Sequence, residues 1–134
     1  MQAFSKENFI SLKYNANEEI GNQYFKKYNC QSVPHLLFVD SKGNEVDRII
    51  GFLPPTEYLI RIEDIAHKRN TLNDYLARYK KGEISADIIA AIALKYEDRK
   101  ENDKAVEFYS ILIRDYPDPL SEYYKQGKFF LASH

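Results

Sequence analysis

Residues 30–51, CQSVPHLLFVDSKGNEVDRIIG, decide how the first half of the chain folds. The apolar run at 36–40 has the length of a strand, and 44–51 reads as a second strand after the SKGN turn, so a β-hairpin is predicted. Pro34 stands at the strand entrance, where a proline costs no ladder hydrogen bond. An X-Pro bond becomes cis at a cost of only about 0.5–1 kcal/mol. We therefore expect a cis Val33–Pro34 bond that presents the preceding backbone to a ligand.

The segments on either side of this stretch extend the pattern. FISLKY at 9–14 alternates like a strand, and 15–29 reads as a helix. That helix has a possible cap at Asn17 and one apolar face, made of Ile20, Tyr24 and Tyr28. A further helix is expected over residues 55–69, where two prolines suit its start. The predicted order is β-α-β-β-α.

From Thr71 onward the hydrophobic period is helical. A helix capped by Thr71 ends near Gly82, Ser85 caps a second helix, and a third begins at Asn102 and is stopped by Pro117. A fourth runs from about residue 120 to the end. We therefore divide the chain into an α/β part at 1–70 and an all-α part at 71–134.

Composition excludes several classes of function. The 134 residues include 19 basic and 20 acidic side chains, so the chain has no excess of positive charge that would attract nucleic acid. No apolar window is long enough to span a membrane, and the first residues lack the order of a signal peptide. His67 and His134 have no partner at metal-ligand spacing, and there is no glycine-rich phosphate loop. We predict no metal and no cofactor.

The order of features in residues 28–62 resembles the thioredoxin-like superfamily, and the resemblance extends over about residues 8–68. It implies an α/β thioredoxin-like fold with a cis proline beside a redox disulfide. It also implies that Val33, Pro34 and His35 line a groove that binds an extended peptide through the Val33 backbone. The family usually has threonine where this chain has His35. That histidine either tunes thiol chemistry or has no catalytic role.

The chain departs from this family at its front. A redox-active Cys-x-x-Cys and a central strand would precede residues 9–14, but Cys30 is the one cysteine in the sequence. We expect Cys30 to be a buried, inert thiol at a core position rather than a reactive one, and we predict no catalytic residue. The sequence is interpreted as an N-terminally truncated part of a thiol–disulfide oxidoreductase. By resemblance, such proteins are often extracytoplasmic in bacteria, and no compartment is predicted for this chain.

Loss of a central strand leaves strand edges whose backbone groups need partners. Either the segment at 9–14 closes on the strand at 36–40, or a second copy of the chain supplies the pairing. We expect a homodimer.

Residues 89–117 resemble a tetratricopeptide unit. Eight residues stand at that repeat's offsets: Ile89, Ile92, Ala93, Tyr96, Ala105, Tyr109, Leu112 and Pro117. The pattern recurs about 34 residues on, where Ala93 corresponds to Gly127. Such a tail either caps the α/β part or binds a protein or peptide partner. Two functions therefore remain open: a redox-inactive relative of the oxidoreductases, or a non-catalytic binding module.

Overall fold

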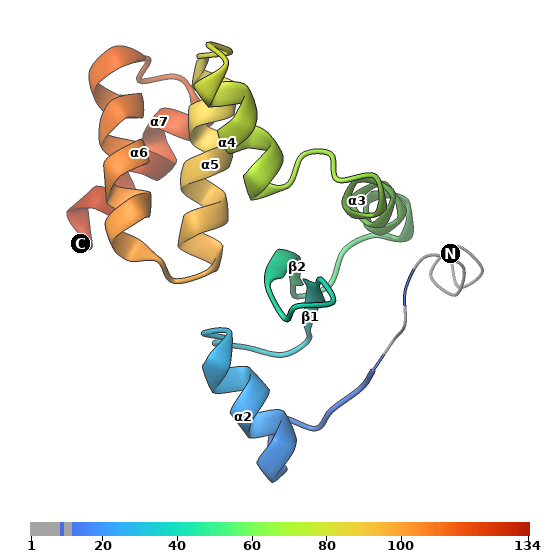
Figure 1. Ribbon diagram of the computed structural model, residues 1–134. Helices are drawn as coiled ribbons and strands as arrows, with labels where there is room; N and C mark the ends of the chain where they lie inside the picture. Colours follow the sequence, from blue (N-terminus) through green and yellow to red (C-terminus); the bar gives the residue numbers. More distant parts are fainter. Residues whose placement is uncertain (1–8, 10–11) are drawn as a thin grey trace. The chain divides into compact units, whose positions relative to one another are not determined.

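The computed structural model describes residue 9 and residues 12–134, and it divides the chain into two compact units, Met1–Thr71 and Leu72–His134 (Figure 1). The first unit is mixed α/β and the second is helical. The elements in chain order are α2 (Glu19–Lys27), β1 (His35–Val39), β2 (Glu45–Ile50), α3 (Pro55–Ala66), α4 (Leu72–Lys80), α5 (Ala86–Asp98), α6 (Asn102–Asp115) and α7 (Glu122–Ala132).

The predicted hairpin is confirmed. Strands β1 and β2 pair antiparallel, and the Asp40 N–H donates to the Asn44 carbonyl at 2.9 Å to close the turn. Gly43 has φ +82°, a conformation that glycine adopts readily. The register is irregular: Phe38 pairs with Asp47, but Val39 pairs with Glu45. β2 therefore carries one extra residue, a β-bulge.

The strand predicted at 9–14 is not found in the described residues. Phe9 and residues 12–14 lie outside any strand, and residues 10 and 11 lie outside the described part of the chain. The sheet formed by the described residues has two strands, β1 and β2. A strand without a paired neighbour gains no ladder hydrogen bonds. An alternating pattern alone was therefore not enough to predict a strand at this place. The Phe9 ring instead contacts the Phe38 ring edge-on, with 5.3 Å between centroids.

Helix α2 forms as predicted but begins with a different cap. Its N-cap residue is Glu18, and Asn17 instead donates its N–H to the Asn15 side chain at 2.9 Å. Asn15 thus makes the tight turn that precedes the helix, a common role for asparagine. The predicted apolar face is largely exposed at Ile20 and Tyr24. This helix therefore buries little of the surface that its pattern suggested.

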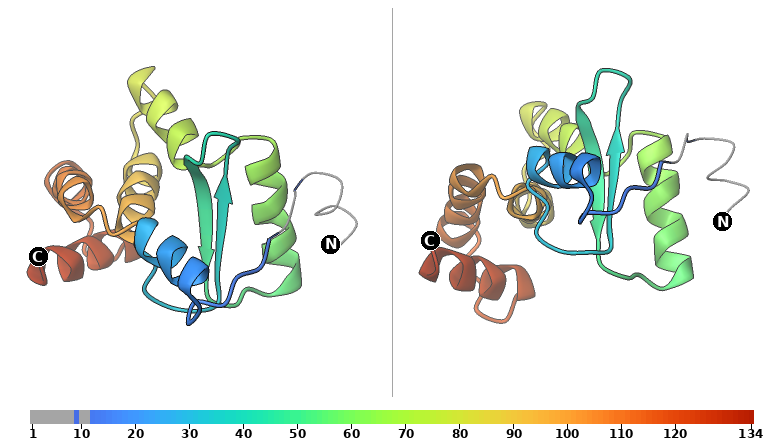
Figure 2. Two further views of the ribbon diagram at one scale, coloured as in Figure 1. Left: turned by 60° about the horizontal axis from the view of Figure 1, so that its bottom comes forward. Right: turned by 90° about the horizontal axis from the view of Figure 1, so that it is seen from below.

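Helix α3 begins at Pro55, as the sequence predicted, and ends at Ala66. Proline suits the first turn because the N–H it lacks would have no helical partner there. Figure 2 shows α2 and α3 on opposite sides of the hairpin. Ile62 and Ile65 are the buried side chains of α3.

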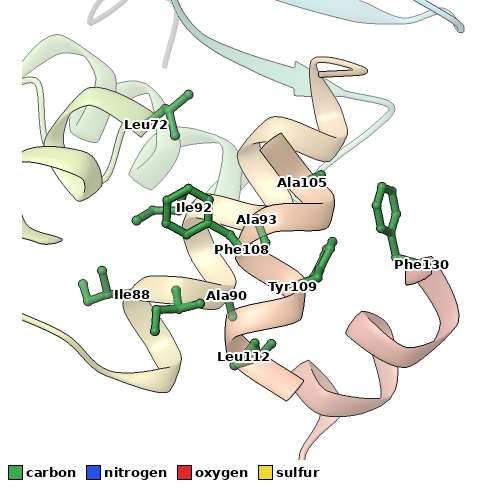
Figure 3. Close-up of a cluster of buried hydrophobic side chains, with 11 residues drawn as sticks. Leu72, Ile88, Ala90, Ile92, Ala93, Ala105, Phe108, Tyr109, Leu112 and Phe130 are labelled. Carbon is green, nitrogen blue, oxygen red and sulfur yellow. The ribbon is translucent and has the colours of Figure 1, made fainter. Parts of the chain in front are cut away.

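The second unit has its own hydrophobic core, contributed by α4 to α7 (Figure 3). Ser85 caps α5 as predicted, with its Oγ accepting from the Ile88 N–H at 3.3 Å. The helix expected from Asn102 begins there, with Glu101 as its N-cap residue. Small residues lie where α5 and α6 pack together: Ala93 and Ala105 have no exposed surface. The fourth predicted helix is α7, which contributes Phe130 to this core.

Candidate functional site

The loop between α2 and β1 carries Val33 and Pro34, and β1 begins with His35, the third residue that the sequence singled out. The Val33–Pro34 bond is cis, as predicted. The Pro34 carbonyl accepts a hydrogen bond from the Gly51 N–H at 2.9 Å, so this proline is tied to the end of β2. The Val33 side chain is 69% exposed. Within the described part of the chain, neither the N–H nor the C=O of Val33 has a hydrogen-bond partner.

His35 links this loop to β2 through both ring nitrogens. Its Nδ1 lies 3.3 Å from the Ser32 carbonyl oxygen, and its Nε2 lies 3.3 Å from Nη1 of Arg48. A guanidinium only donates, so Nε2 must accept and Nδ1 must carry the proton that is donated to Ser32. The geometry thus selects the neutral imidazole. Burial and the Arg48 charge both lower the pKa of His35.

Arg48 is the centre of a buried polar cluster that the sequence did not reveal. Its side chain is 3% exposed and holds Glu45 in a two-pronged ion pair, with Nε–Oε2 at 2.8 Å and Nη2–Oε1 at 2.5 Å. The same Nη2 donates to the Tyr28 carbonyl at 2.6 Å. One side chain of β2 therefore joins the end of α2, the partner Glu45 and the ring of His35.

The β-bulge explains why sequence reasoning missed this cluster. Residues 45 and 48 are three apart, and in a regular strand they would point to opposite faces. The extra residue, Val46, shifts the alternation by one and lets Glu45 and Arg48 meet. The available signal was three charged residues, Glu45, Asp47 and Arg48, within a strand of six residues.

Cys30 lies four residues before the proline and is buried, with 6% of its surface exposed. Its N–H donates to the Phe25 carbonyl at 2.9 Å, which fixes it at the end of α2. Burial is the largest influence on the thiol and raises its pKa, while the Arg48 charge opposes this. The thiolate is the reactive form, so this environment disfavours nucleophilic chemistry.

Residue 9 and residues 12–134 contain neither a metal-binding cluster nor a membrane-spanning helix. No group of three or more His, Cys, Asp or Glu side chains there could hold a metal ion. In the same residues, no helix combines the length and the apolar content needed to cross a membrane.

Comparison with known families agrees with this geometry. Residues 2–66 match the family model described as a thioredoxin-like domain. The match ends at the residue where α3 ends. The chain thus has a thioredoxin-like domain followed by a helical C-terminal region, and with one cysteine it contains no Cys-x-x-Cys pair. Neither a search of curated proteins nor a search of solved structures found a match.

Proposed function

We propose that this chain is a thioredoxin-like protein related to the thiol–disulfide oxidoreductases, and that it does not run the dithiol cycle by itself. That cycle needs an attacking thiolate and a resolving cysteine. The chain has Cys30 alone, and burial raises its pKa. The buried single thiol is the observation that carries this proposal.

Reduction of insulin by dithiothreitol tests it. The full chain is expected to leave the rate of insulin precipitation at the uncatalysed value, and Cys30→Ser is expected to behave identically. An active dithiol oxidoreductase serves as the positive control. Catalysis by the chain that disappears in Cys30→Ser would overturn the proposal.

A second candidate function is a non-catalytic module that binds an extended peptide at Val33, Pro34 and His35. Its specific support is the Val33 backbone, whose N–H and C=O have no partner in the described residues while the side chain is exposed. An extended peptide satisfies such groups by main-chain hydrogen bonds. The contacts of His35 with Ser32 and Arg48 hold the loop in this form before any ligand arrives.

Two substitutions at one position test the binding function. Val33→Ala keeps the backbone donor, whereas Val33→Pro removes it. Fluorescence anisotropy with labelled, unfolded insulin B chain is expected to show binding to the wild type and to Val33→Ala but weaker binding to Val33→Pro. Equal affinity for both variants, each shown to be folded by circular dichroism, would contradict a site at this backbone.

For the helical region, we propose that α5 and α6 form one tetratricopeptide-like unit and that α7 is the first helix of another. The support is the packing of small residues at the repeat's offsets. Ala93 and Ala105 have no exposed surface, and a Cβ on Gly127 would lie 3.3 Å from the Tyr109 and Ile113 side chains. Three or more repeats are normally needed for an independent binding groove. We therefore assign this region a structural role rather than partner binding.

A further inference from the structure

Among the described residues, no strand other than β2 pairs with β1, and two hydrogen bonds define which backbone groups its outer edge presents. The Gly51 N–H donates to Pro34, and the Asp40 N–H donates to Asn44. Residues 34 and 40, which flank β1, therefore point these backbone groups toward β2. Because antiparallel pairing alternates, the N–H and C=O of His35, Leu37 and Val39 point the other way. The bulge does not disturb this alternation, since the extra residue is in β2.

On the opposite edge of the hairpin, one outward backbone group of β2 has a partner from α3. Arg48 pairs with Leu37, so its carbonyl points away from β1. That carbonyl accepts a hydrogen bond from Arg61 Nη2 of α3 at 2.8 Å. For β1, no described residue provides an equivalent partner to His35, Leu37 or Val39 on the outer side.

We propose that the outer edge of β1 pairs with the same edge of a second copy of this chain, antiparallel about a two-fold axis at Leu37. In this register Leu37 faces its own counterpart, His35 faces Val39, and Leu36 faces Phe38. The three outward residues of each copy then form hydrogen-bonded pairs, so every open N–H and C=O of the edge finds a partner. The proposal is independent of redox activity, and the pairing ends at His35 and leaves Val33 outside it.

The sequence of the edge favours a second copy over other occupants. HLLFV contains no lysine, aspartate or glutamate, the charges that usually protect an exposed edge. Self-pairing places Leu37 opposite Leu37 and Leu36 opposite Phe38, and it sets Asp40 against Pro34 rather than against a like charge. The intrachain alternative, pairing with residues 9–14, is not seen for Phe9 or residues 12–14, which lie outside any strand.

Introducing opposite charges at Leu37, on the two-fold axis, tests the proposal. Light scattering of the full chain is expected to give twice the monomer mass of 15.7 kDa. Leu37→Lys and Leu37→Glu each place like charges face to face, so each alone is expected to be monomeric. An equimolar mixture places Lys against Glu and is expected to restore the dimer. Restoration in the mixture is specific to this register.

Leu37 is half-buried, so a charge at this position also destabilises the folded monomer. A second variant, at a more exposed position, separates the two effects. Val39 is 46% exposed, and Val39→Lys is expected to weaken the dimer while keeping the wild-type circular dichroism spectrum. The matched control is Phe52→Lys, since Phe52 is 91% exposed but lies outside both strands, and it should remain dimeric. A wild type that stays monomeric at its highest soluble concentration would overturn the proposal. So would a dimer that persists in folded Val39→Lys, or one that only Phe52→Lys dissociates.

Discussion

Arg48 Nη2 donates a hydrogen bond of 2.6 Å to the carbonyl oxygen of Tyr28, and this contact fastens the end of α2 to the hairpin. Tyr28 is the C-cap residue of α2, where carbonyl groups lack helical partners. Because Ile20 and Tyr24 of this helix are exposed, the attachment depends on a polar contact more than on apolar burial. The order of the loop that follows, including the candidate site, should therefore depend on Arg48.

The first prediction follows from this dependence. Arg48→Met leaves the Glu45 carboxylate, whose side chain is 10% exposed, without its cation. Breaking a buried ion pair from one side costs roughly 3–5 kcal/mol, because the remaining charge is uncompensated. Urea unfolding followed by circular dichroism should show a loss of this order in the free energy of unfolding. The matched control is Arg114→Met, which removes an ion pair with Asp115 at a site where the arginine side chain is 71% exposed, and no measurable change is expected. Similar effects for both variants would contradict a structural role of the Arg48 cluster.

A second prediction concerns pH. Burial and Arg48 lower the pKa of His35 below its ordinary value of 6.5, so the unfolded chain binds a proton there more readily than the folded chain. The contribution of neutral His35 to the free energy of unfolding is therefore complete above the pKa of the unfolded chain. It declines as the pH falls through the pKa of the folded chain. Urea unfolding between about pH 7.5 and pH 5.5 should show the free energy of unfolding decreasing toward acid. His35→Gln removes the titration and keeps an acceptor for Arg48, so its slope over this range should be smaller. An unchanged slope would show that His35 does not titrate differently on folding.

Local patterns predicted most of the elements correctly. The hairpin, α3 and the helices of the second unit each have a period, a cap or a turn residue that acts within a few positions, such as Ser85 or Gly43. The strand expected at 9–14 was not found in the described residues. Its pattern is local, but its stability depends on a neighbouring strand.

The candidate site was predictable only in part. The cis bond at Pro34 could be inferred from its place before a strand, and the burial of Cys30 from the core position that it matches in the thioredoxin-like family. The contacts of His35 with Arg48 could not, since they require the register of β2 and its bulge. Nothing in a single sequence indicates where one extra residue enters a strand.

A third prediction tests the thiol directly. Native Cys30 should react with iodoacetamide at least about tenfold more slowly than in urea, which corresponds to an activation free energy higher by about 1.4 kcal/mol. The reason is that the thiol is buried and its pKa is raised by burial. Because the folded pKa lies above the unfolded value of 9.0, stability from this group is full below that pH and is lost as the pH rises further. Cys30→Ser should give no alkylation. Equal rates with and without urea would show that the thiol is accessible in the folded chain.

The last prediction concerns Gly127, where α7 packs on α6. A Cβ at this position would lie 3.3 Å from side-chain atoms of both Tyr109 and Ile113, so the site has room for little more than hydrogen. In Gly127→Ala, the better helix propensity of alanine, about 1 kcal/mol, offsets this crowding, and we expect a stability within about 1 kcal/mol of the wild type. Gly127→Leu overpacks the interface and should cost about 1–3 kcal/mol. The control Lys128→Leu adds a leucine at the next, exposed position of α7 and should change stability by no more than about 0.5 kcal/mol. Thermal and urea unfolding would measure all three, and equal stability of Gly127→Leu and Lys128→Leu would show that the two helices do not approach each other closely at Gly127.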